Sequence, residues 1–167
     1  MRIEITPLPL AEKPILQALM ELYQYDFSVY DHADVDACGR YGYAYLDLYW
    51  TEAQRRPYLV RVEGKLAGFA LVRQLSQPGE APMHSIAEFF VMKKYRRLGV
   101  GSRAAQEVFD RTPGAWRLEI IPENTPAQAF WRRVVGEYSG GRFSEALEVA
   151  GERRRIVLTF DSQNRSA

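Results

Sequence analysis

Apolar residues recur along the chain with two different periods, and these periods predict alternating strands and helices. Alternation or short apolar runs predict about seven strands, over residues 2–7, 58–62, 66–74, 84–91, 116–121, 138–147 and 154–160. Helical spacing of three and four residues predicts helices over 11–25, 99–111 and 126–136, with a short helix over 35–38 as a fourth. Strands and helices in this order predict an α+β fold.

Turn-forming residues separate these elements. Glu63-Gly64 predicts a tight hairpin between two strands, and Gly151 predicts the turn that joins the last two strands. Pro126 falls where the first turn of a helix tolerates proline. The segment 25–50 has no clear period, and Gly39 and Gly42 within it favour a loop.

Composition bounds the function without naming it. With 167 residues, we expect one domain over 1–161 followed by a polar tail over 162–167. The formal net charge of +1 provides no global field for nucleic acid or a membrane surface. The single cysteine, Cys38, excludes an internal disulfide. The sequence has no apolar run long enough for a leader peptide or a membrane span. We therefore expect a cytoplasmic protein. Two histidines, His32 and His84, without ligand spacing predict no metal site.

The most informative segment is an apolar strand followed by a basic turn, two glycines and an amphipathic helix. The backbone N–H groups at a helix start have no partner within the helix, and glycine lets an anion approach them closely. The turn therefore predicts a phosphate or pyrophosphate site, whose residues are Lys93, Lys94, Arg96, Arg97, Gly99 and Gly101.

Three glycine-rich designs compete for this turn. A nucleoside triphosphate loop needs a lysine after its last glycine, and a dinucleotide fingerprint needs a third glycine where this chain has Ala104. The third design is Arg/Gln-x-x-Gly-x-Gly/Ala, present as Arg96-Arg-Leu-Gly99-Val-Gly101. A second element follows a predicted strand and reads Asn124-x-x-Ala127-x-x-Phe130-Trp131. On these two motifs the chain resembles the GNAT superfamily of acyl-CoA-dependent N-acetyltransferases, over about residues 83–135.

The resemblance implies a fold and a cofactor. It implies a mixed, mostly antiparallel sheet in which two central strands splay apart and hold acetyl-CoA, here 88–92 and 116–121. The acyl donor would be acetyl-CoA, without a metal. The residues that would contact it are Phe90, Val91, Met92, Arg96, Arg97, Leu98, Gly99, Val100, Gly101, Ser102, Asn124, Phe130 and Trp131. For Asn124 a helix cap is the alternative, and both roles can hold together.

The resemblance also implies acid–base chemistry, because the attacking amine must be neutral. Glu88 is the candidate base, and a structural carboxylate on the open sheet face or in an ion pair is the alternative. Glu119 on the neighbouring strand is a second candidate. Trp131 stands where the family often has an acidic tyrosine, and indole cannot replace that group. The candidate acid is therefore Tyr138 or a tyrosine of 41–49, unless the thiolate leaves unassisted.

The acceptor side falls in the segment 23–50, which holds seven of the ten tyrosines and five of the seven aspartates. Aromatic faces and carboxylates together suit a cation, which favours an amine acceptor at Tyr25, Asp26, Tyr30 and Asp31. The alternative is ordinary packing and loop capping. Family members often form homodimers, and the sequence leaves the oligomeric state open.

Four functions remain open at this stage. The leading hypothesis is an N-acetyltransferase that acts on a primary amine of a small molecule or peptide. An acyltransferase with a different acyl-CoA is the second, and a non-catalytic acyl-CoA sensor that has lost the acid is the third. A nucleotide-binding protein ranks fourth.

Overall fold

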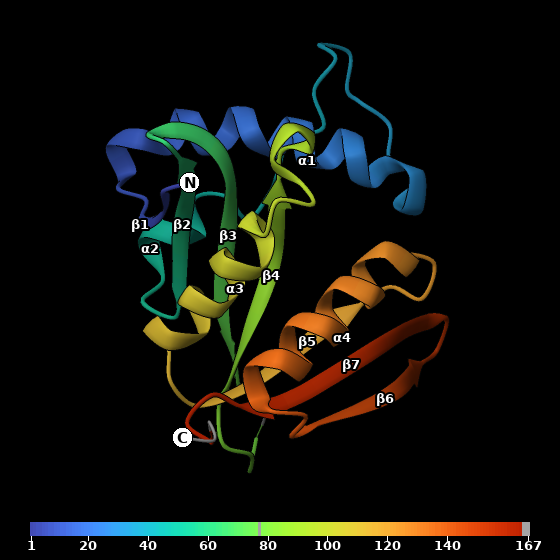
Figure 1. Ribbon diagram of the computed structural model, residues 1–167. Coiled ribbons are helices and arrows are strands. Elements are labelled where there is room, and N and C mark those ends of the chain that lie inside the picture. The colour runs from blue at the N-terminus through green and yellow to red at the C-terminus, as the bar shows by residue number, and fades with distance from the viewer. Residues whose placement is uncertain (77, 165–167) are drawn as a thin grey trace.

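The computed structural model describes residues 1–76 and 78–164, and its described strands form one seven-stranded mixed sheet (Figure 1). The strand order is β1-β2-β3-β4-β5-β7-β6, and all neighbours are antiparallel except β4 and β5. The strands are β1 (Ile3–Pro7), β2 (Arg55–Val62), β3 (Lys65–Leu75), β4 (Met83–Val91), β5 (Ala115–Ile120), β6 (Phe143–Ala150) and β7 (Arg153–Asp161). This arrangement confirms the expected α+β, mostly antiparallel sheet.

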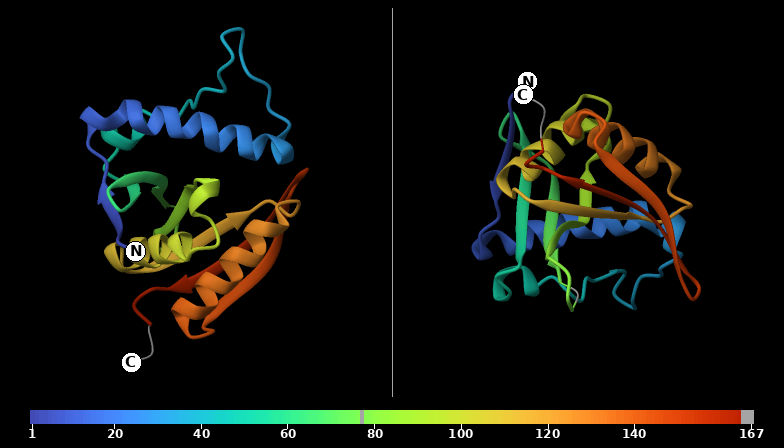
Figure 2. Two further views of the ribbon diagram at one scale, coloured as in Figure 1. Left: turned by 45° about the horizontal axis from the view of Figure 1, so that its top comes forward. Right: turned by 90° about the horizontal axis from the view of Figure 1, so that it is seen from below.

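Helices cover both faces of this sheet (Figure 2). They are α1 (Lys13–Asp31), α2 (Leu48–Thr51), α3 (Val100–Arg111) and α4 (Thr125–Ser139), with 3₁₀ turns η1 (Leu10–Glu12) and η2 (Lys93–Tyr95). One apolar cluster joins α3 and α4 to the sheet, and a second joins α1 and α2 to the opposite face. Leu16, Leu19 and Met20 of α1 follow helical spacing and pack with Phe69 and Leu71 of β3 in the second cluster.

The two central parallel strands diverge. Their register contains a single pair, His84 with Trp116, near the start of β4. Beyond that pair β5 follows β7, with which it shares six registered pairs, and the ribbons of β4 and β5 separate (Figure 1). The carboxyl-terminal half of β4 therefore has an edge that another strand does not cover.

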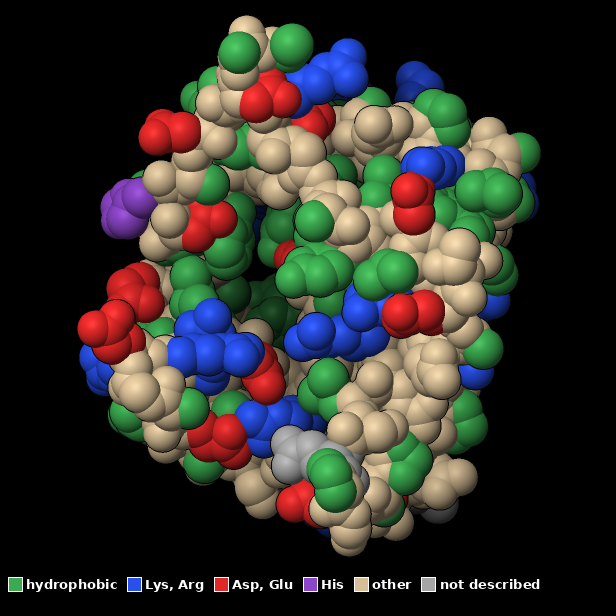
Figure 3. All heavy atoms as spheres, turned by 180° about the vertical axis from the view of Figure 1, so that it is seen from behind, with side chains coloured by type: hydrophobic (Ala, Val, Ile, Leu, Met, Phe, Trp, Pro, Cys, Tyr) green, Lys and Arg blue, Asp and Glu red, His purple; other side chains and the backbone are tan. Residues whose placement is uncertain are grey.

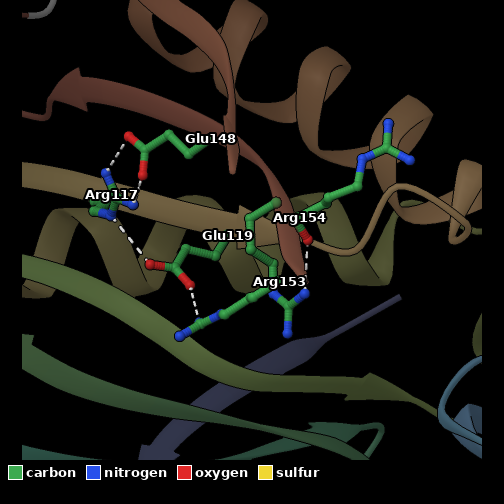
Figure 4. A network of polar contacts seen from close by, with 6 residues as sticks. Arg117, Glu119, Glu148, Arg153 and Arg154 are labelled. Carbon is green, nitrogen blue, oxygen red and sulfur yellow. Dashed lines mark hydrogen bonds and ion pairs between the residues drawn. The ribbon is translucent and has the colours of Figure 1, made fainter. Parts of the chain in front are cut away.

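An ion-pair network fastens β5, β6 and β7 together on the open side of the sheet (Figure 4). Arg117 of β5 donates two hydrogen bonds to Glu148 of β6, at 2.9 and 2.5 Å, and one to Glu119 at 3.1 Å. Arg153 of β7 donates to the other oxygen of Glu119 at 2.6 Å. The carboxylate of Glu119, the second candidate base, is thus held between two guanidinium groups in a structural ion pair.

The expected boundary between the fourth helix and the next strand was wrong. Helix α4 continues through Gly136 to Ser139, and β6 begins at Phe143 rather than at Tyr138. The helix ends at Gly140, which has a φ of +61° and whose N–H donates to the carbonyl of Gly136. The buried residues Val134, Val135 and Tyr138 share helical spacing, so packing extends the helix past the first glycine.

The segment between α1 and β2 also differs from the expectation. Helix α1 extends to Asp31, and residues 35–38 form a turn rather than a helix. The carboxylate of Asp36 accepts hydrogen bonds from the N–H groups of Cys38 and Arg40, at 2.8 and 3.0 Å, which favours a turn over a helix. The short helix in this region is α2 instead.

The first residue of the expected polar tail packs against the sheet. Ser162 is buried, and it exchanges backbone and hydroxyl hydrogen bonds with Gly114 at the start of β5. Residues 165–167 of the expected tail lie outside the described residues.

One glycine holds β3 and β4 close together. A Cβ atom on Gly68 would lie 1.9 Å from the carbonyl oxygen of Phe90, which is backbone and cannot turn aside. We expect Gly68→Ala to lower the free energy of unfolding by about 1–3 kcal/mol, the usual cost of overpacking. Chemical denaturation at neutral pH measures this change.

Gly136→Ala is the matched control for that substitution. Its Cβ would meet only a ring atom of Phe143 at 3.6 Å, an ordinary contact inside helix α4. We expect Gly136→Ala to stabilise the protein by up to about 1 kcal/mol, because alanine favours helix over glycine. Equal stability of Gly68→Ala and the wild type would contradict the close approach.

Candidate functional site

The glycine turn presents an open helix start. Gly99 precedes α3 with a φ of +80°, and a Cβ atom there would meet nothing within 4 Å. Arg97 also has a positive φ, of +64°, so two residues of the turn adopt the left-handed conformation. The first N–H groups of α3 and the positive end of its dipole face this opening. The turn therefore has the geometry of an anion site.

A cleft of about 1020 Å³ runs from this turn along the divergent edge of β4. Its walls come from α1, β4, the turn and α4, and it includes ten of the expected cofactor residues: Phe90, Val91, Arg96, Arg97, Gly99, Gly101, Ser102, Asn124, Phe130 and Trp131. Three other expected cofactor residues do not line the cleft. Val100 is fully buried, Leu98 is exposed, and the backbone N–H of Met92 donates to the carbonyl of Ala67. Seen from behind, the molecule is hollowed, with apolar side chains inside the hollow and Lys and Arg side chains beside it (Figure 3).

The backbone of Val91 turns its polar groups toward the gap. The N–H of Met92 donates to Ala67 at 2.8 Å, and paired residues of antiparallel strands alternate between bonded and non-bonded pairs. The neighbouring pair, Val91 with Gly68, is therefore a non-bonded pair, whose N–H and C=O groups point away from β3. The carbonyl of Val91 accepts a hydrogen bond from Nε of Arg96 at 2.7 Å, and the N–H faces the space between β4 and β5.

Arg96 and Asp26 bond to each other. Arg96 Nη2 lies 2.5 Å from one oxygen of Asp26, and Lys93 Nζ lies 3.2 Å from the other. Burial opposes ionisation of Asp26, but the hydrogen bonds from Arg96 and Lys93 outweigh it and lower the pKa of the carboxyl. The pair ties α1 to the glycine turn. Arg96 is thus a strut at the edge of the cleft, and Asp26, an expected acceptor residue, lines the cleft while it is bonded to the turn.

Arg133 is a cleft residue that the sequence did not single out. It lies on α4, lines the cleft, and its Nη2 is 3.3 Å from the hydroxyl of Ser102 at the start of α3. The preceding Arg132 turns to the other side of the helix and pairs with Glu145 of β6 at 2.6 Å. Adjacent arginines differ by about 100° around a helix, and only the position of α3 shows which one reaches the turn. Three arginines line the described cleft beside the glycines: Arg96, Arg97 and Arg133.

Glu88 lies in a half-buried cluster of tyrosines on the α1 side of the sheet. Tyr23 of α1 donates to Oε2 of Glu88 at 2.5 Å, and Tyr43 of the following loop donates to Oε1 at 3.2 Å. Burial raises the pKa of Glu88, although both hydroxyls and the charge of Arg73 act in the opposite direction. Glu88 is therefore neither on an open sheet face nor in a described ion pair, and the cluster has the properties expected of a base.

Three aromatic side chains form one wall of the gap. Trp131 is 8% exposed and packs edge-on against Phe89 and Phe130, with ring centroids 5.1 and 4.8 Å away. Asn124 caps the helix that carries Phe130 and Trp131, since its side chain accepts a hydrogen bond from the N–H of Ala127 at 3.1 Å. The cap is present, and Asn124 also lines the cleft.

Tyr138 is placed away from the cleft. It is 6% exposed, packs against Phe109 and Phe160 in the α3–α4 cluster, and donates to Asp110 at 2.8 Å. Because α4 continues through this position, its side chain faces the core. The structure thus places the Tyr138 side chain in the core, apart from Glu88 and outside the residues that line the cleft.

Of the remaining expected acceptor residues, one lines the cleft and two lie outside it. Tyr30 lines the cleft. Tyr25 is 68% exposed on the outer side of α1. Asp31 is exposed at the end of α1, where it accepts a hydrogen bond from the N–H of Ala33 at 3.0 Å.

Comparison with known proteins identifies the family. The family model described as Acetyltransferase (GNAT) family matches residues 16–136, which include most of α1, the glycine turn and most of α4. The chain belongs to the GNAT acetyltransferase family. No curated protein sequence matches it. The acceptor of this GNAT protein is therefore not identified by relatedness.

Solved structures confirm the GNAT fold at low sequence identity. An acetyltransferase from Thermus thermophilus has a TM-score of 0.68 at 15% identity, covering 96% of this chain and 97% of that one. RimL, a ribosomal L7/L12 α-N-protein acetyltransferase in complex with coenzyme A, has a TM-score of 0.68 at 12% identity, covering 97% and 95%. An acetyltransferase of the GNAT family from Staphylococcus aureus has a TM-score of 0.64 at 16% identity, covering 96% and 99%.

Two absences concern the described part of the chain. None of its helices is long and apolar enough to cross a membrane. Its described residues also contain no group of three or more His, Cys, Asp or Glu side chains that could hold a metal ion.

The Asp26–Arg96 strut generates a pH-dependent prediction. Because folding lowers the pKa of Asp26, its contribution is present above the unfolded pKa and is lost as pH falls through the folded pKa. We expect Asp26→Asn to lower the free energy of unfolding by about 0.2–1 kcal/mol at neutral pH, as for partly exposed pairs, and by less in acid. Urea unfolding at several pH values measures the difference.

Asp34→Asn is the control, because it removes the same charge from an exposed position of the same segment. If the loss of unfolding free energy changes with pH in the same way in Asp26→Asn and in Asp34→Asn, the stabilising role of the Asp26–Arg96 pair is contradicted.

Proposed function

We propose that this GNAT protein is an N-acetyltransferase that moves an acetyl group from acetyl-CoA to a primary amine. The observation that carries the proposal is that one cleft is lined both by a helix start with the geometry of an anion site and by Tyr23, which is bonded to Glu88. The reaction requires a site for a phosphate-bearing acyl donor and a group that accepts a proton. The helix start suits the first requirement, and the Tyr23–Glu88 pair suits the second.

The residues of the cleft fit acetyl-CoA. The pyrophosphate would lie against the open turn at Gly99 and the first N–H groups of α3, with Arg97 and Arg133 as countercharges. The pantetheine arm would follow the free edge of β4 beside the wall of Phe89, Phe130 and Trp131. The N–H of Val91 faces this gap, and there it would bind the carbonyl of the thioester and the negative charge that develops on it.

The α1 side of the cleft supports an amine as the acceptor. An amine attacks only in its neutral form, so a base must remove a proton from the ammonium ion. Glu88, which is bonded to Tyr23, would serve as this base, and the rings of Tyr23, Phe27 and Tyr30 in the cleft suit a cation before it loses its proton. Asp26 is already neutralised by Arg96 and Lys93, so it contributes less to acceptor binding than the sequence implied.

The fold does not select between a small molecule and a peptide. Structures of the same fold include the α-N-protein acetyltransferase RimL and an aminoglycoside acetyltransferase, meta-AAC0020, in complex with trehalose. The latter has a TM-score of 0.63 at 16% identity and covers 90% of this chain. The proposal therefore names a primary amine and leaves its carrier to experiment.

Two measurements test this function in sequence. Acetyl-CoA at about 100 times its Kd should stabilise the protein by roughly 2.7 kcal/mol, which raises the melting temperature by several degrees, whereas ATP and NAD should not. A panel of small amines and amino-terminal peptides should then release free thiol from acetyl-CoA. Stabilisation by acetyl-CoA without thiol release from any amine would favour the acyl-CoA sensor instead, and the absence of any stabilisation would reject the cofactor site.

Arg133 allows a sharper test of where the phosphates bind. We expect Arg133→Ala to weaken acetyl-CoA binding about tenfold, or ~1.4 kcal/mol, because it removes a charge-assisted contact at the glycine turn. Isothermal titration calorimetry measures the change.

Arg132→Ala is the matched control on the adjacent residue of the same helix, where the side chain pairs with Glu145 outside the cleft. It should leave the affinity within about twofold of the wild type. Similar losses in both variants would indicate a general effect of net charge, and no loss in Arg133→Ala would place the phosphates elsewhere.

A further inference from the structure

Tyr23 stands between Glu88 and the cleft. Its ring packs edge-on against Phe69 and Phe90, with centroids 5.8 and 6.0 Å away, so its orientation is fixed by the core. Its hydroxyl donates to Oε2 of Glu88 at 2.5 Å, and the residue itself lines the cleft. Glu88 is not among the lining residues of the cleft. A ligand in the cleft thus meets the tyrosine before it meets the carboxylate.

Tyr43 provides an internal comparison. It donates to the other carboxylate oxygen of Glu88, at 3.2 Å, from the loop that follows α1. Unlike Tyr23, it is not among the residues that line the cleft. The two hydroxyls therefore bind different oxygens of the carboxylate, and only one of the two tyrosines lines the cleft.

We propose that Tyr23 is a catalytic residue that relays a proton from the acceptor nitrogen to Glu88. The inference rests on the proposed function, because it names the group in the cleft through which the amine is deprotonated. It assigns Tyr43 a supporting role, in which the second hydroxyl holds the carboxylate in place.

The step balances without a further reagent. One N–H bond of the ammonium breaks as its proton passes to the Tyr23 oxygen, while the proton of Tyr23 passes to Glu88. The neutral nitrogen then bonds to the acetyl carbon and the carbon–sulfur bond breaks. The proton that the nitrogen loses next neutralises the departing thiolate, and Glu88 returns its own proton to solvent. No separate acid is required, which agrees with Trp131 at the family's tyrosine position and with Tyr138 in the core.

The surroundings favour a relay over an ionised tyrosine. Burial, followed by the charge of Glu88, raises the pKa of Tyr23 well above its usual value, so the hydroxyl keeps a proton and must accept one as it gives one. The groups that act on Glu88 through hydrogen bonds are Tyr23 and Tyr43, and those that act through charge include Asp31 of α1, Tyr49 of α2 and Arg73 of β3. Burial raises the pKa of Glu88 despite Arg73, which makes the carboxylate a stronger base once it has ionised.

Tyr23→Phe and Tyr43→Phe form the matched pair that tests the relay. Each removes one hydroxyl from Glu88 and keeps the ring, but of the two tyrosines only Tyr23 lines the cleft. We expect Tyr23→Phe to lower kcat/KM for the amine at least about 100-fold, within the range of general base catalysis, with acetyl-CoA affinity unchanged. Tyr43→Phe should lose less than about tenfold. The acid limb of its pH profile should move to higher pH, because a hydrogen bond that stabilised the carboxylate is lost.

A double-mutant cycle separates a relay from two independent effects. If Tyr23 and Glu88 act as one unit, Tyr23→Phe combined with Glu88→Gln should be no slower than the slower single variant. Losses that multiply would overturn the relay. Equal, small losses in Tyr23→Phe and Tyr43→Phe would also overturn it, because they would indicate support of the carboxylate alone.

The controls keep this test distinct from that of the proposed function. If the wild type releases no thiol with any amine, the proposed function itself fails. If the wild type and Tyr43→Phe are active and Tyr23→Phe retains full activity, only the relay fails.

A second variant is needed if Tyr23→Phe melts far below the wild type. 3-Fluorotyrosine at position 23 retains the hydroxyl and the packing but lowers the proton affinity of the hydroxyl. An unchanged kcat/KM in that protein would reject the relay, and a changed value with a moved pH profile would support it.

Discussion

The separation of β4 from β5 is the constraint on which the rest of the structure depends. Strands normally pair along their full length because an unpaired N–H or C=O group in the interior is costly. Here the pairing stops after His84 and Trp116, and the sheet remains intact because β5 continues with β7 while β4 continues with β3. The ion pairs of Arg117 hold the departing half together. The cleft, the free N–H of Val91 and the aromatic wall all follow from this one interruption, because each occupies space that a full ladder would close.

The parts of the site that sequence could predict are those formed by neighbours in the chain. The open turn at Gly99, the cap at Asn124 and the hairpin at Glu63-Gly64 depend on the conformations of a few adjacent residues, and the structure has them. The contacts that sequence could not predict join distant segments, such as Tyr23 with Glu88 across 65 positions and Arg96 with Asp26 across 70. The end of α4 shows why boundaries fail: Gly136 and Gly140 are equally plausible stops, and only the buried faces of Val135 and Tyr138 decide between them.

Motif position and physical role also separate in the basic turn. Four cations surround the glycines in sequence, and all four fit a phosphate site equally well on charge alone. In three dimensions α1 brings Asp26 against two of them, so Arg96 and Lys93 are partly neutralised before any ligand arrives. Arg133 of α4 supplies charge from the opposite side, by its Ser102 contact. The electrostatic field at the helix start is therefore set by which helices flank the turn, and a charge count along the chain cannot supply it.

The tyrosine cluster around Glu88 is the part of the core that stability alone explains least. The neighbouring positions on this face, Phe69, Leu71 and Phe90, are apolar, and an apolar residue at 88 would pack with them without the cost of desolvating a carboxylate. Two hydroxyls offset part of that cost, yet burial still raises the pKa of Glu88. As pH rises through this raised pKa, the ionised form weakens the folded state, because the unfolded chain releases the same proton more readily. A group that costs stability at the pH where it is ionised, and that is bonded to a tyrosine of the cleft wall, is best explained by chemistry in the cleft.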